Sequence, residues 1–279
     1  MFSISRDAAP VAFAMGLGSL AVDHSGQQAP ASRRSTLATA DPRRLATPLV
    51  QPGAGLPAGP RAPTGLAPLD ALLEGGFPRG QITELVGPRT SGRTRVLLGT
   101  LAEATARGGW AALVDAADAL DPAVAAALGV PLGRLLWVRC GGQLKAAWRA
   151  ADILVRSGGF ELVAVDLGDP PPWALGRTPP AVFVRLQRAV EQAAVGLLVA
   201  GPRRVAGSLA TVAVGLIPRA IHWAPGGPGL LAGLETEARL IRSRTRAPGA
   251  GVRLVWAALE PGRSWPAAGL ARASVGGAS

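Results

Sequence analysis

The sequence predicts an α/β fold in which a mostly parallel sheet is flanked by helices. Two patterns support this prediction: short apolar runs alternate with longer segments of helical period, and a glycine-rich loop joins one such run to one such segment. The chain has 279 residues, of which 48% are hydrophobic, and this is enough apolar side chain for a large packed core. We therefore expect one globular domain with tails.

Buried strands are predicted for five apolar runs that lie between turn residues. Each run has the length and the composition of a strand that is covered on both faces. The runs are residues 82–86, 111–115, 135–138, 162–166 and 195–200.

Two segments between these runs have a helical period. Residues 93–107 end at a Gly-Gly pair, and residues 143–157 gather their apolar side chains on one face, made of Leu144, Trp148, Ala151 and Val155. After residue 200 the pattern changes, because little helical period separates the next three runs. We expect these runs to form antiparallel strands that extend the sheet; they are residues 220–224, 238–243 and 252–258.

Composition divides the chain into three parts. Residues 1–63 are expected to be a flexible, low-complexity segment, because residues 26–63 are rich in Gln, Ala, Pro, Ser and Arg and keep no period. Residues 64–260 form the predicted domain. Residues 261–279 return to Gly, Ala, Ser and Arg and are expected to be a disordered tail.

The charge of the chain is strongly positive. Arginine and lysine total 29 against 18 acidic residues, a formal charge of +11, which favours a polyanionic partner such as nucleic acid or an acidic protein surface. However, Lys145 is the only lysine and tyrosine is absent. A GC-rich genome would produce the same bias, so the charge alone leaves both interpretations open.

One cysteine and one apolar stretch bear on the compartment. Cys140 is alone, which excludes an internal disulfide and a cysteine-based metal cluster. Residues 8–22 are rather apolar, but Gly16 and Gly18 interrupt them and the stretch is too short to span a bilayer. We therefore expect a cytoplasmic protein without a membrane partner.

A phosphate-binding loop is predicted at residues 87–94, Gly-Pro-Arg-Thr-Ser-Gly-Arg-Thr, which follow a predicted strand and open a predicted helix. Glycines let backbone N–H groups face phosphate oxygens, and the helix N-terminus favours an anion. Only the lysine of the G-x-x-x-x-G-K-[ST] pattern is replaced. Arg93 stands at its position, and its planar guanidinium is bulkier than the ammonium group of lysine. The nucleotide-binding candidates are Gly87, Ser91, Gly92, Arg93, Thr94 and Arg95, with Thr94 as the magnesium ligand. A glycine-rich turn without a nucleotide role is the alternative.

The residues around this loop resemble the RecA ATPase core. Residues 64–70 (Thr-Gly-Leu-Ala-Pro-Leu-Asp), 75–80 (Gly-Gly-Phe-Pro-Arg-Gly) and 84–88 (Glu-Leu-Val-Gly-Pro) are similar to its start. Residues 115–122 (Asp-Ala-Ala-Asp-Ala-Leu-Asp-Pro), followed by Leu-Gly-Val at 128–130, resemble its next signature. The resemblance covers residues 64–260, is strongest before Val138, and implies a RecA-like P-loop core with antiparallel C-terminal strands.

Three positions depart from the RecA pattern where that family does its chemistry. Arg93 stands in place of the phosphate-binding lysine, Ala117 in place of the glutamate that activates water, and Pro202 in place of the glutamine that senses the terminal phosphate. The resemblance therefore implies a pseudo-ATPase or a weak ATPase. A slow ATPase that uses Asp115 or Asp118 as the missing acid stays open as an alternative, and so does the binding of ATP and Mg²⁺.

Other family positions are kept. Asp121 matches the residue that contacts adenine in RecA, and Asp166 matches the carboxylate that holds Mg²⁺ through water. Arg242 and Arg244 resemble a basic pair that contacts the nucleotide of the neighbouring subunit in RecA filaments. The alternatives are a strand-end cap for Asp166 and a solvated strand face for the arginine pair.

Two loops correspond to the DNA-contacting loops of RecA, residues 168–180 and residues 203–208. Trp173 could stack on a base of single-stranded DNA, while Arg177, Arg203 and Arg204 could meet phosphates. A site for docking a protein partner, or simple packing, is the alternative for Trp173.

Within the RecA superfamily the chain looks most like ImuA-type proteins, because no counterpart of RecA's separate C-terminal domain or N-terminal polymerisation helix is found. That resemblance implies a role in SOS-induced, error-prone translesion synthesis. The implied partners are an ImuB-like Y-family protein, an error-prone DnaE-type polymerase and single-stranded DNA, with self-association or RecA itself as further partners. An active DNA-dependent ATPase of the RecA family and a SulA-like cell-division inhibitor are the alternative functions.

Overall fold

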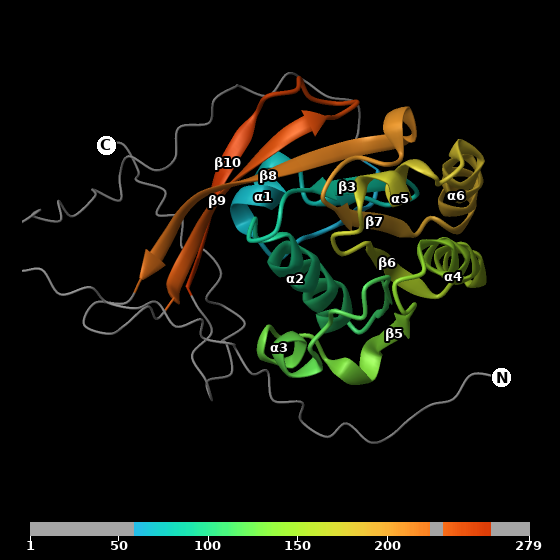
Figure 1. Cartoon of the computed structure of the whole chain (residues 1–279), viewed down its shortest axis with the longest axis horizontal. Coiled ribbons are helices and arrows are strands. Elements are labelled where there is room, and N and C mark those ends of the chain that lie inside the picture. The colour runs from blue at the N-terminus through green and yellow to red at the C-terminus, as the bar shows by residue number, and fades with distance from the viewer. Residues whose placement is uncertain (1–58, 224–230, 258–279) are drawn as a thin grey trace, which may run out of the picture. The chain divides into compact units, whose positions relative to one another are not determined.

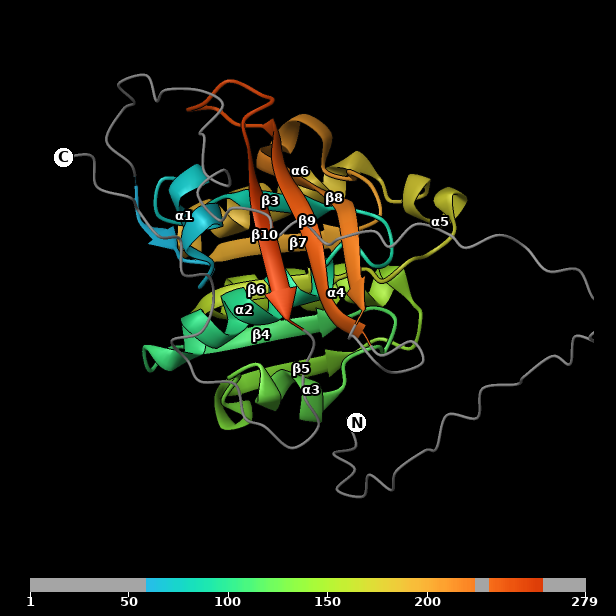
Figure 2. The same cartoon turned by 90° about the vertical axis from the view of Figure 1, so that its left-hand side faces the viewer.

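A computed structural model describes residues 59–223 and 231–257, and within them the chain forms an eight-stranded sheet (Figures 1 and 2). The strands lie in the order β10-β9-β8-β3-β7-β6-β4-β5. Their bounds are β3 (Ile82–Val86), β4 (Trp110–Asp115), β5 (Leu135–Arg139), β6 (Phe160–Asp166), β7 (Gly196–Gly201), β8 (Ala210–Trp223), β9 (Leu231–Arg242) and β10 (Gly251–Ala257). All five predicted runs are strands, and four of them are buried as expected. The prediction of burial was wrong for β5, because this strand lies at the edge of the sheet and its residues are partly or fully exposed.

Six neighbouring strands, from β8 to β5, run parallel, while β8, β9 and β10 pair antiparallel at the other end of the sheet. The fold class predicted from the sequence is thus confirmed. The prediction placed the first antiparallel strand at residues 220–224, but β8 already begins at Ala210 and pairs in parallel with β3. Its first seven residues are buried and the rest is largely exposed. One strand therefore combines two burial patterns, and the sequence analysis recognised only the second.

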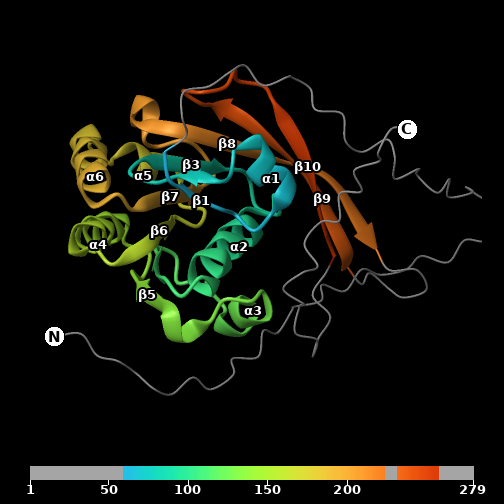
Figure 3. The same cartoon turned by 180° about the vertical axis from the view of Figure 1, so that it is seen from behind.

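Helices cover both faces of the sheet. One apolar cluster contains side chains from α1 (Ala67–Leu72), α2 (Arg93–Ala106), α3 (Pro122–Ala127), β9 and β10. On the other face lie α4 (Leu144–Ser157) and α6 (Pro180–Ala193) (Figure 3). The second cluster contains apolar side chains from both of these helices. The predicted helices at 93–107 and 143–157 are α2 and α4. The shorter elements are β1 (Arg61–Ala62), β2 (Phe77–Pro78), α5 (Pro172–Gly176), and the 3₁₀ turns η2 (Leu132–Arg134) and η3 (Gly207–Leu209).

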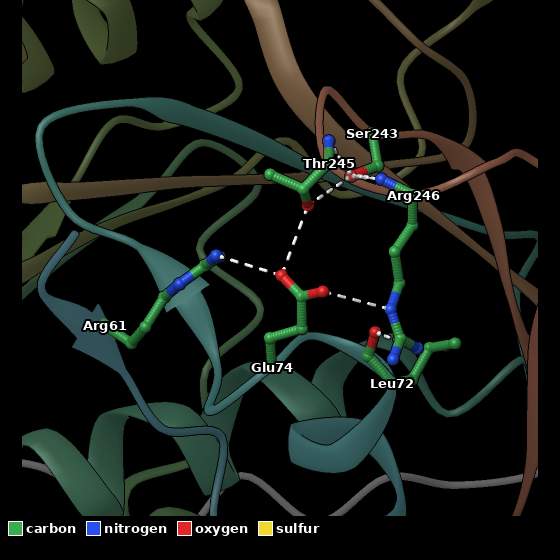
Figure 4. A network of polar contacts seen from close by, with 6 residues as sticks. All are labelled: Arg61, Leu72, Glu74, Ser243, Thr245 and Arg246. Atoms are coloured by element: carbon green, nitrogen blue, oxygen red, sulfur yellow. Dashed lines mark hydrogen bonds and ion pairs between the residues drawn. The ribbon is translucent and has the colours of Figure 1, made fainter. Parts of the chain in front are cut away.

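The turn between β9 and β10 is fastened to the first described elements through Glu74 (Figure 4). The carboxylate of Glu74 accepts hydrogen bonds from Arg246 at 3.2 Å and Thr245 at 3.3 Å, and it pairs with Arg61 of β1 at 3.4 Å. Arg246 also donates to the carbonyl oxygen of Leu72 at 3.2 Å. These contacts hold the β9–β10 turn beside α1, so the two strands lie over the face that carries α2.

Of the segment predicted to be flexible, residues 59–63 are described and include β1, which pairs with β2. Residues 1–58 and the predicted tail at 261–279 lie outside the described residues.

Candidate phosphate-binding site

The carboxyl ends of the central parallel strands meet at one edge of the sheet. Val86 at the end of β3 lies opposite Gly201 of β7, and Asp115 at the end of β4 lies opposite Asp166 of β6. The loops that follow these four strands therefore start side by side. They carry the positions that the sequence analysis singled out, Arg93, Ala117, Asp166 and Pro202. This edge is where ligands bind in open α/β sheets.

The glycine-rich loop has the predicted context, because it runs from β3 directly into α2. Gly92 is the N-cap of α2 and has a φ of 82°, in the left-handed region that favours glycine. A β-carbon on Gly87 would lie 2.9 Å from the carbonyl oxygen of Leu216 in β8, so the first glycine is required by close packing. Ser91 between them is buried, and Thr94 is exposed.

The side chain of Arg93 turns back into the protein and is only 8% exposed. Its guanidinium donates to the carbonyl oxygen of Gly87 and, through Nη2, to that of Gly168 at 2.9 Å. Nη2 also lies 3.3 Å from Oδ1 of Asp169. In a phosphate loop the lysine at this position reaches the β- and γ-phosphates. Here the cation is bound by the protein's own carbonyl and carboxylate oxygens.

Strands β9 and β10 pack onto the same loop. The hydroxyl of Thr236 in β9 donates to the carbonyl oxygen of Ser91 at 3.0 Å, and both residues are buried. The buried ring of Trp256 in β10 lies against Gly92, where a β-carbon would overlap its six-membered ring. Trp256 and Asp169 were not predicted to belong to this site, because no local pattern reveals a contact between segments so far apart in the chain.

Asp166 and Ala117 meet at the turn after β6. The carboxylate of Asp166 accepts a hydrogen bond from the backbone N–H of Gly168 at 2.9 Å. Burial raises the pKa of Asp166 above the ordinary value of an aspartate, although the nearby Arg93 acts in the opposite direction. A β-carbon on Gly168 would lie 2.6 Å from the β-carbon of Ala117. Ala117 therefore borders the predicted site, and its methyl group cannot accept a proton.

Both acids that could replace the missing glutamate hold backbone groups. Asp115 is buried and accepts from the N–H groups of Ala119 at 3.1 Å and Leu120 at 2.9 Å. Asp118 accepts from the N–H of Cys140 at 3.0 Å and pairs with Arg139 at 3.3 Å. The oxygens of Asp115 bind the loop after β4 and those of Asp118 bind the residues after β5, which argues against either acid as the base of a slow ATPase.

The remaining nucleotide-binding candidates are Asp121, Arg242, Arg244 and Arg95. Asp121 is the N-cap of α3 and accepts from the N–H of Ala123 at 2.8 Å. Arg242 donates to the carbonyl oxygens of Ala210 at 2.9 Å and Ser208 at 3.3 Å, while Arg244 is exposed in the turn after β9. Arg95 is half-buried in α2, and burial lowers its pKa. Roles in binding adenine or a neighbour's nucleotide stay predictions for these residues.

The residues predicted to bind DNA divide into two groups. Trp173 of α5 is 64% exposed, the guanidinium of Arg177 lies 5.7 Å from its ring centroid, and Arg203 donates to the carbonyl oxygen of Pro172 in the same helix. Arg204 instead pairs at 2.9 Å with Glu84, which is 1% exposed in β3. Trp173, Arg177 and Arg203 therefore lie together at α5. Arg204 instead holds the loop after β7 to Glu84 of β3.

These contacts do not fit ATP with Mg²⁺ in the arrangement that the loop adopts. Arg93, which would meet the phosphates, spans from Gly87 to the turn after β6, and Trp256 covers Gly92. Thr94 and Asp166 retain the oxygens that a magnesium ion would need, but Ala117 supplies no acid beside them. The loop keeps the shape of a phosphate loop. However, the guanidinium of Arg93 and the N-terminus of α2 contact other groups of the protein.

Part of the chain is similar in sequence to known proteins. Residues 61–168 match the model of the RecA N-terminal domain. Two RecA proteins, from Picosynechococcus sp. and Symbiobacterium thermophilum, are 46% and 50% identical over 104 and 105 residues, which is 37% of this chain in both cases. Residues 61–168 are therefore similar to the N-terminal domain of RecA. The match covers the first strands, the phosphate loop and the turn after β6.

A solved structure supports the same fold over a longer stretch. The crystal structure of the RadB recombinase superposes with a TM-score of 0.53, covering 69% of this chain and 94% of that chain at 20% identity. The likeness to RadB concerns the fold alone. The chain spans 30% of the length of the two RecA proteins. Within the described residues, every helix is too short or too polar to cross a membrane.

Proposed function

We propose that this protein is a DNA-repair accessory factor whose RecA-type core binds DNA and protein partners and turns over ATP weakly or not at all. The observation that carries the proposal is the state of Arg93, whose guanidinium is bound by the carbonyl oxygens of Gly87 and Gly168 and by Asp169. A phosphate that entered the loop would have to displace these contacts. A buried, charge-assisted network is costly to break.

The chemistry of neighbouring positions points the same way. Hydrolysis needs a group that orients or deprotonates water, and such a group typically contributes about 10² to 10⁴-fold to the rate. Ala117 lacks it, and Asp115 and Asp118 are engaged with backbone N–H groups. Pro202 has no side-chain amide through which a bound phosphate could be sensed. The three replacements together favour a binding function over an ATP-driven one.

The exposed surface around α5 supports binding of single-stranded DNA. An indole ring offers a face on which any base can stack, and the neighbouring guanidinium groups offer phosphate contacts. Trp173, Arg177 and Arg203 supply these groups next to the turn that follows β6. DNA binding of this kind does not require a nucleotide in the phosphate loop.

The cellular role is proposed from the resemblance to ImuA-type proteins. In this role the protein acts in the cytoplasm, within SOS-induced translesion synthesis, with an ImuB-like Y-family protein and an error-prone DnaE-type polymerase. Recovery of these two proteins with a tagged copy of the full chain from DNA-damaged cells would support the role. Their absence from the recovered material, while the tagged chain is expressed and folded, would exclude it.

One observation favours an active DNA-dependent ATPase as a second candidate. Asp166 stands at the end of β6 beside the phosphate loop, and Thr94 keeps the hydroxyl that a magnesium ion would need. The two candidates differ in how DNA binding responds to ATP. A DNA-dependent ATPase couples the two ligands, and typical couplings between sites change affinity about 5 to 150-fold.

The test is the affinity of the purified full chain for fluorescein-labelled oligothymidylate, measured by anisotropy with and without ATP and Mg²⁺ at one fixed salt concentration. We expect the two Kd values to agree within about twofold, well below a typical allosteric coupling. A change of tenfold or more on adding ATP, lost in the Asp166→Ala variant, would support the ATPase instead. Failure to bind oligothymidylate under either condition would overturn the DNA-binding part of the proposal.

A further inference from the structure

An open groove of about 990 Å³ lies between α4 and α6, on the face of the sheet opposite α2. The two helices lie side by side in different views (Figures 1 and 3). Apolar side chains from both helices line it, among them Leu144 and Ile153 of α4 and Val182 of α6. Ile153 is 64% exposed, so a large aliphatic side chain faces solvent here. We call this feature the α4–α6 groove.

The rim of the α4–α6 groove is basic. Lys145, Arg149, Arg177 and Arg185 line the groove itself, and Arg185 is shared with a second hollow of about 440 Å³ that adds Arg156 and Arg188. The carboxylate in this lining, Asp152, is already paired with Arg156 at 3.1 Å and with Arg185 at 3.3 Å. Six cationic side chains therefore face one acid, and the remaining charge favours an acidic ligand.

The dimensions of the groove suit a helix. Lys145, Arg149 and Ile153 follow one another at intervals of four residues along α4, so they form a stripe parallel to the helix axis. Along α6, Ala181, Val184 and Arg188 of the second hollow are three and four residues apart and so lie on one face of that helix. Each helix has 14 residues and is about 21 Å long at 1.5 Å per residue. A helix that packs between two others contacts both through apolar residues at such spacings.

The lining favours a peptide over a nucleic acid. Bases stack on exposed aromatic faces, but the ring of Trp148 in the groove is buried, donates from Nε1 to Thr178 at 3.1 Å and packs edge-on against Phe183. The groove thus offers aliphatic carbons and the cationic rim, without an exposed ring. Trp173, which has an exposed ring, does not line it.

The rest of this chain does not supply a matching acidic segment. Residues 1–58 contain five arginines and three aspartates, residues 258–279 contain two arginines and one glutamate, and residues 224–230 carry no charge. All three segments outside the described residues are basic or neutral in sequence. None of these three segments complements a basic groove, so we look for its ligand in another molecule.

We propose that the α4–α6 groove binds an amphipathic helix of a partner protein, with aliphatic side chains on the face toward the groove and carboxylates along both sides. The proposal deepens the proposed function, since it names the surface that a protein partner uses, and it rests on that function only for the existence of such a partner. It requires neither ATP nor DNA.

The test uses the purified full chain and a set of fluorescein-labelled synthetic helices of groove length, with leucine, isoleucine or phenylalanine on one face and glutamate elsewhere. Anisotropy is expected to give a Kd below about 100 µM for at least one peptide, a range typical of weak single-helix interactions. The matched control peptides carry lysine in place of glutamate, and we expect them to bind at least tenfold more weakly. Added salt should weaken the glutamate peptide by screening the rim.

Three variants locate the binding. Arg149→Glu reverses a rim charge and Ile153→Asp removes the exposed aliphatic contact; each is expected to weaken the peptide at least tenfold. Arg134→Glu, at an exposed arginine of η2 on the opposite face, is the matched control and should leave the affinity unchanged. Because these side chains are exposed, the circular dichroism spectrum should stay that of the native protein in all three.

Several results would overturn the proposal. The first is that no glutamate peptide binds. The second is that the lysine peptides bind as tightly as the glutamate peptides. The third is that the Arg149→Glu and Ile153→Asp variants bind the glutamate peptides as tightly as the native chain does. If these two variants instead lost affinity for oligothymidylate, the groove would be a nucleic-acid surface. Self-association of the native chain that Ile153→Asp abolishes would assign the groove to a second copy. We expect the Arg149→Glu and Ile153→Asp variants to bind oligothymidylate as the native chain does. The groove and the DNA-binding surface can therefore be tested independently.

Discussion

The ring of Trp256 in β10 rests on Gly92, the residue that caps the first turn of α2. A strand from the end of the described chain thereby covers the start of the helix that follows the phosphate loop. Glu74 holds the turn between β9 and β10 beside α1, so the two strands are also attached to the protein at this turn (Figure 4). The loop, its helix and the antiparallel strands form one packed unit.

Replacing Gly92 tests this packing. Gly92→Ala adds a β-carbon at a φ of 82° and forces it into the indole ring, so we expect the free energy of unfolding to fall by about 2–4 kcal/mol. In a Trp256→Ala background the overlap is gone, and the same change should cost only the backbone strain of about 1–2 kcal/mol. Urea unfolding of the four proteins measures both costs. Equal costs in the two backgrounds would show that the ring does not bear on Gly92.

Glu84 of β3 is expected to be essential for the stability of the protein. Its buried carboxylate accepts from the N–H groups of Val205 at 2.5 Å and Ala206 at 2.7 Å and pairs with Arg204. Glu84→Gln should lower the free energy of unfolding by about 3–5 kcal/mol, because a buried charged network is left mismatched. The matched control is Glu161→Gln, a half-exposed partner of Arg79, which should cost at most about 1 kcal/mol. Similar urea midpoints for the two variants would refute this role.

The stability of the protein should depend on pH through Asp166. Burial raises the pKa of this carboxyl in the folded state, so between its unfolded and folded pKa values the folded chain binds more protons. Stability contributed by this group is therefore present at low pH and lost as the pH rises through that interval. Asp166→Asn removes the buried charge and can still accept from Gly168. We expect this variant to unfold at a higher urea concentration than the native protein near pH 7.

The advantage of Asp166→Asn should shrink as the pH falls toward about 4, the ordinary pKa of an aspartate. Urea midpoints of both proteins across this range give the difference directly, and titration of all other groups cancels in it. A native protein that is more stable than the variant at pH 7, with the gap closing on acidification, would mean that the pKa of Asp166 is lowered by its partners.

The account of DNA binding predicts a specific role for Trp173. Trp173→Ala should weaken oligothymidylate binding by about 1–3 kcal/mol, the usual value of one stacked base. Trp110 is the matched control, because it is also exposed and has an arginine, Arg134, 6.0 Å from its ring centroid, but stands at the start of β4. Trp110→Ala should leave the affinity unchanged. Equal losses in both variants would indicate non-specific stacking.

The parts of the fold that depend on local patterns were predictable. Five strands, α2 and α4 follow from runs of apolar residues and from helical period, and the phosphate loop from its glycines and its place between a strand and a helix. The burial of β5 was not predictable in this way, because its place at the sheet edge depends on strand order. The sequence analysis left residues 181–194 unassigned, although Phe183, Leu186 and Val190 have helical spacing and are buried in α6. This helix directly follows the proline-rich stretch that was predicted as a loop, residues 168–180.

The contacts that decide the site were not predictable from one sequence. Arg93 meets Gly168 across 75 residues of chain, and Thr236 meets Ser91 across 145. Such pairs depend on strand order and on the bend of β8 and β9, which no local period encodes. The sequence identified which positions lie at the site, but the structure shows that their hydrogen bonds are directed at the protein itself.

The most direct test of the central claim is nucleotide binding and phosphate release by the purified full chain, with and without single-stranded DNA, beside a variant that carries Arg93→Lys and Ala117→Glu. We expect the native chain to release no phosphate above the Asp166→Ala variant and to gain nothing from added DNA, since Arg93 is held by Gly87, Gly168 and Asp169. DNA-stimulated phosphate release that Asp166→Ala abolishes would contradict the account and establish a divergent ATPase.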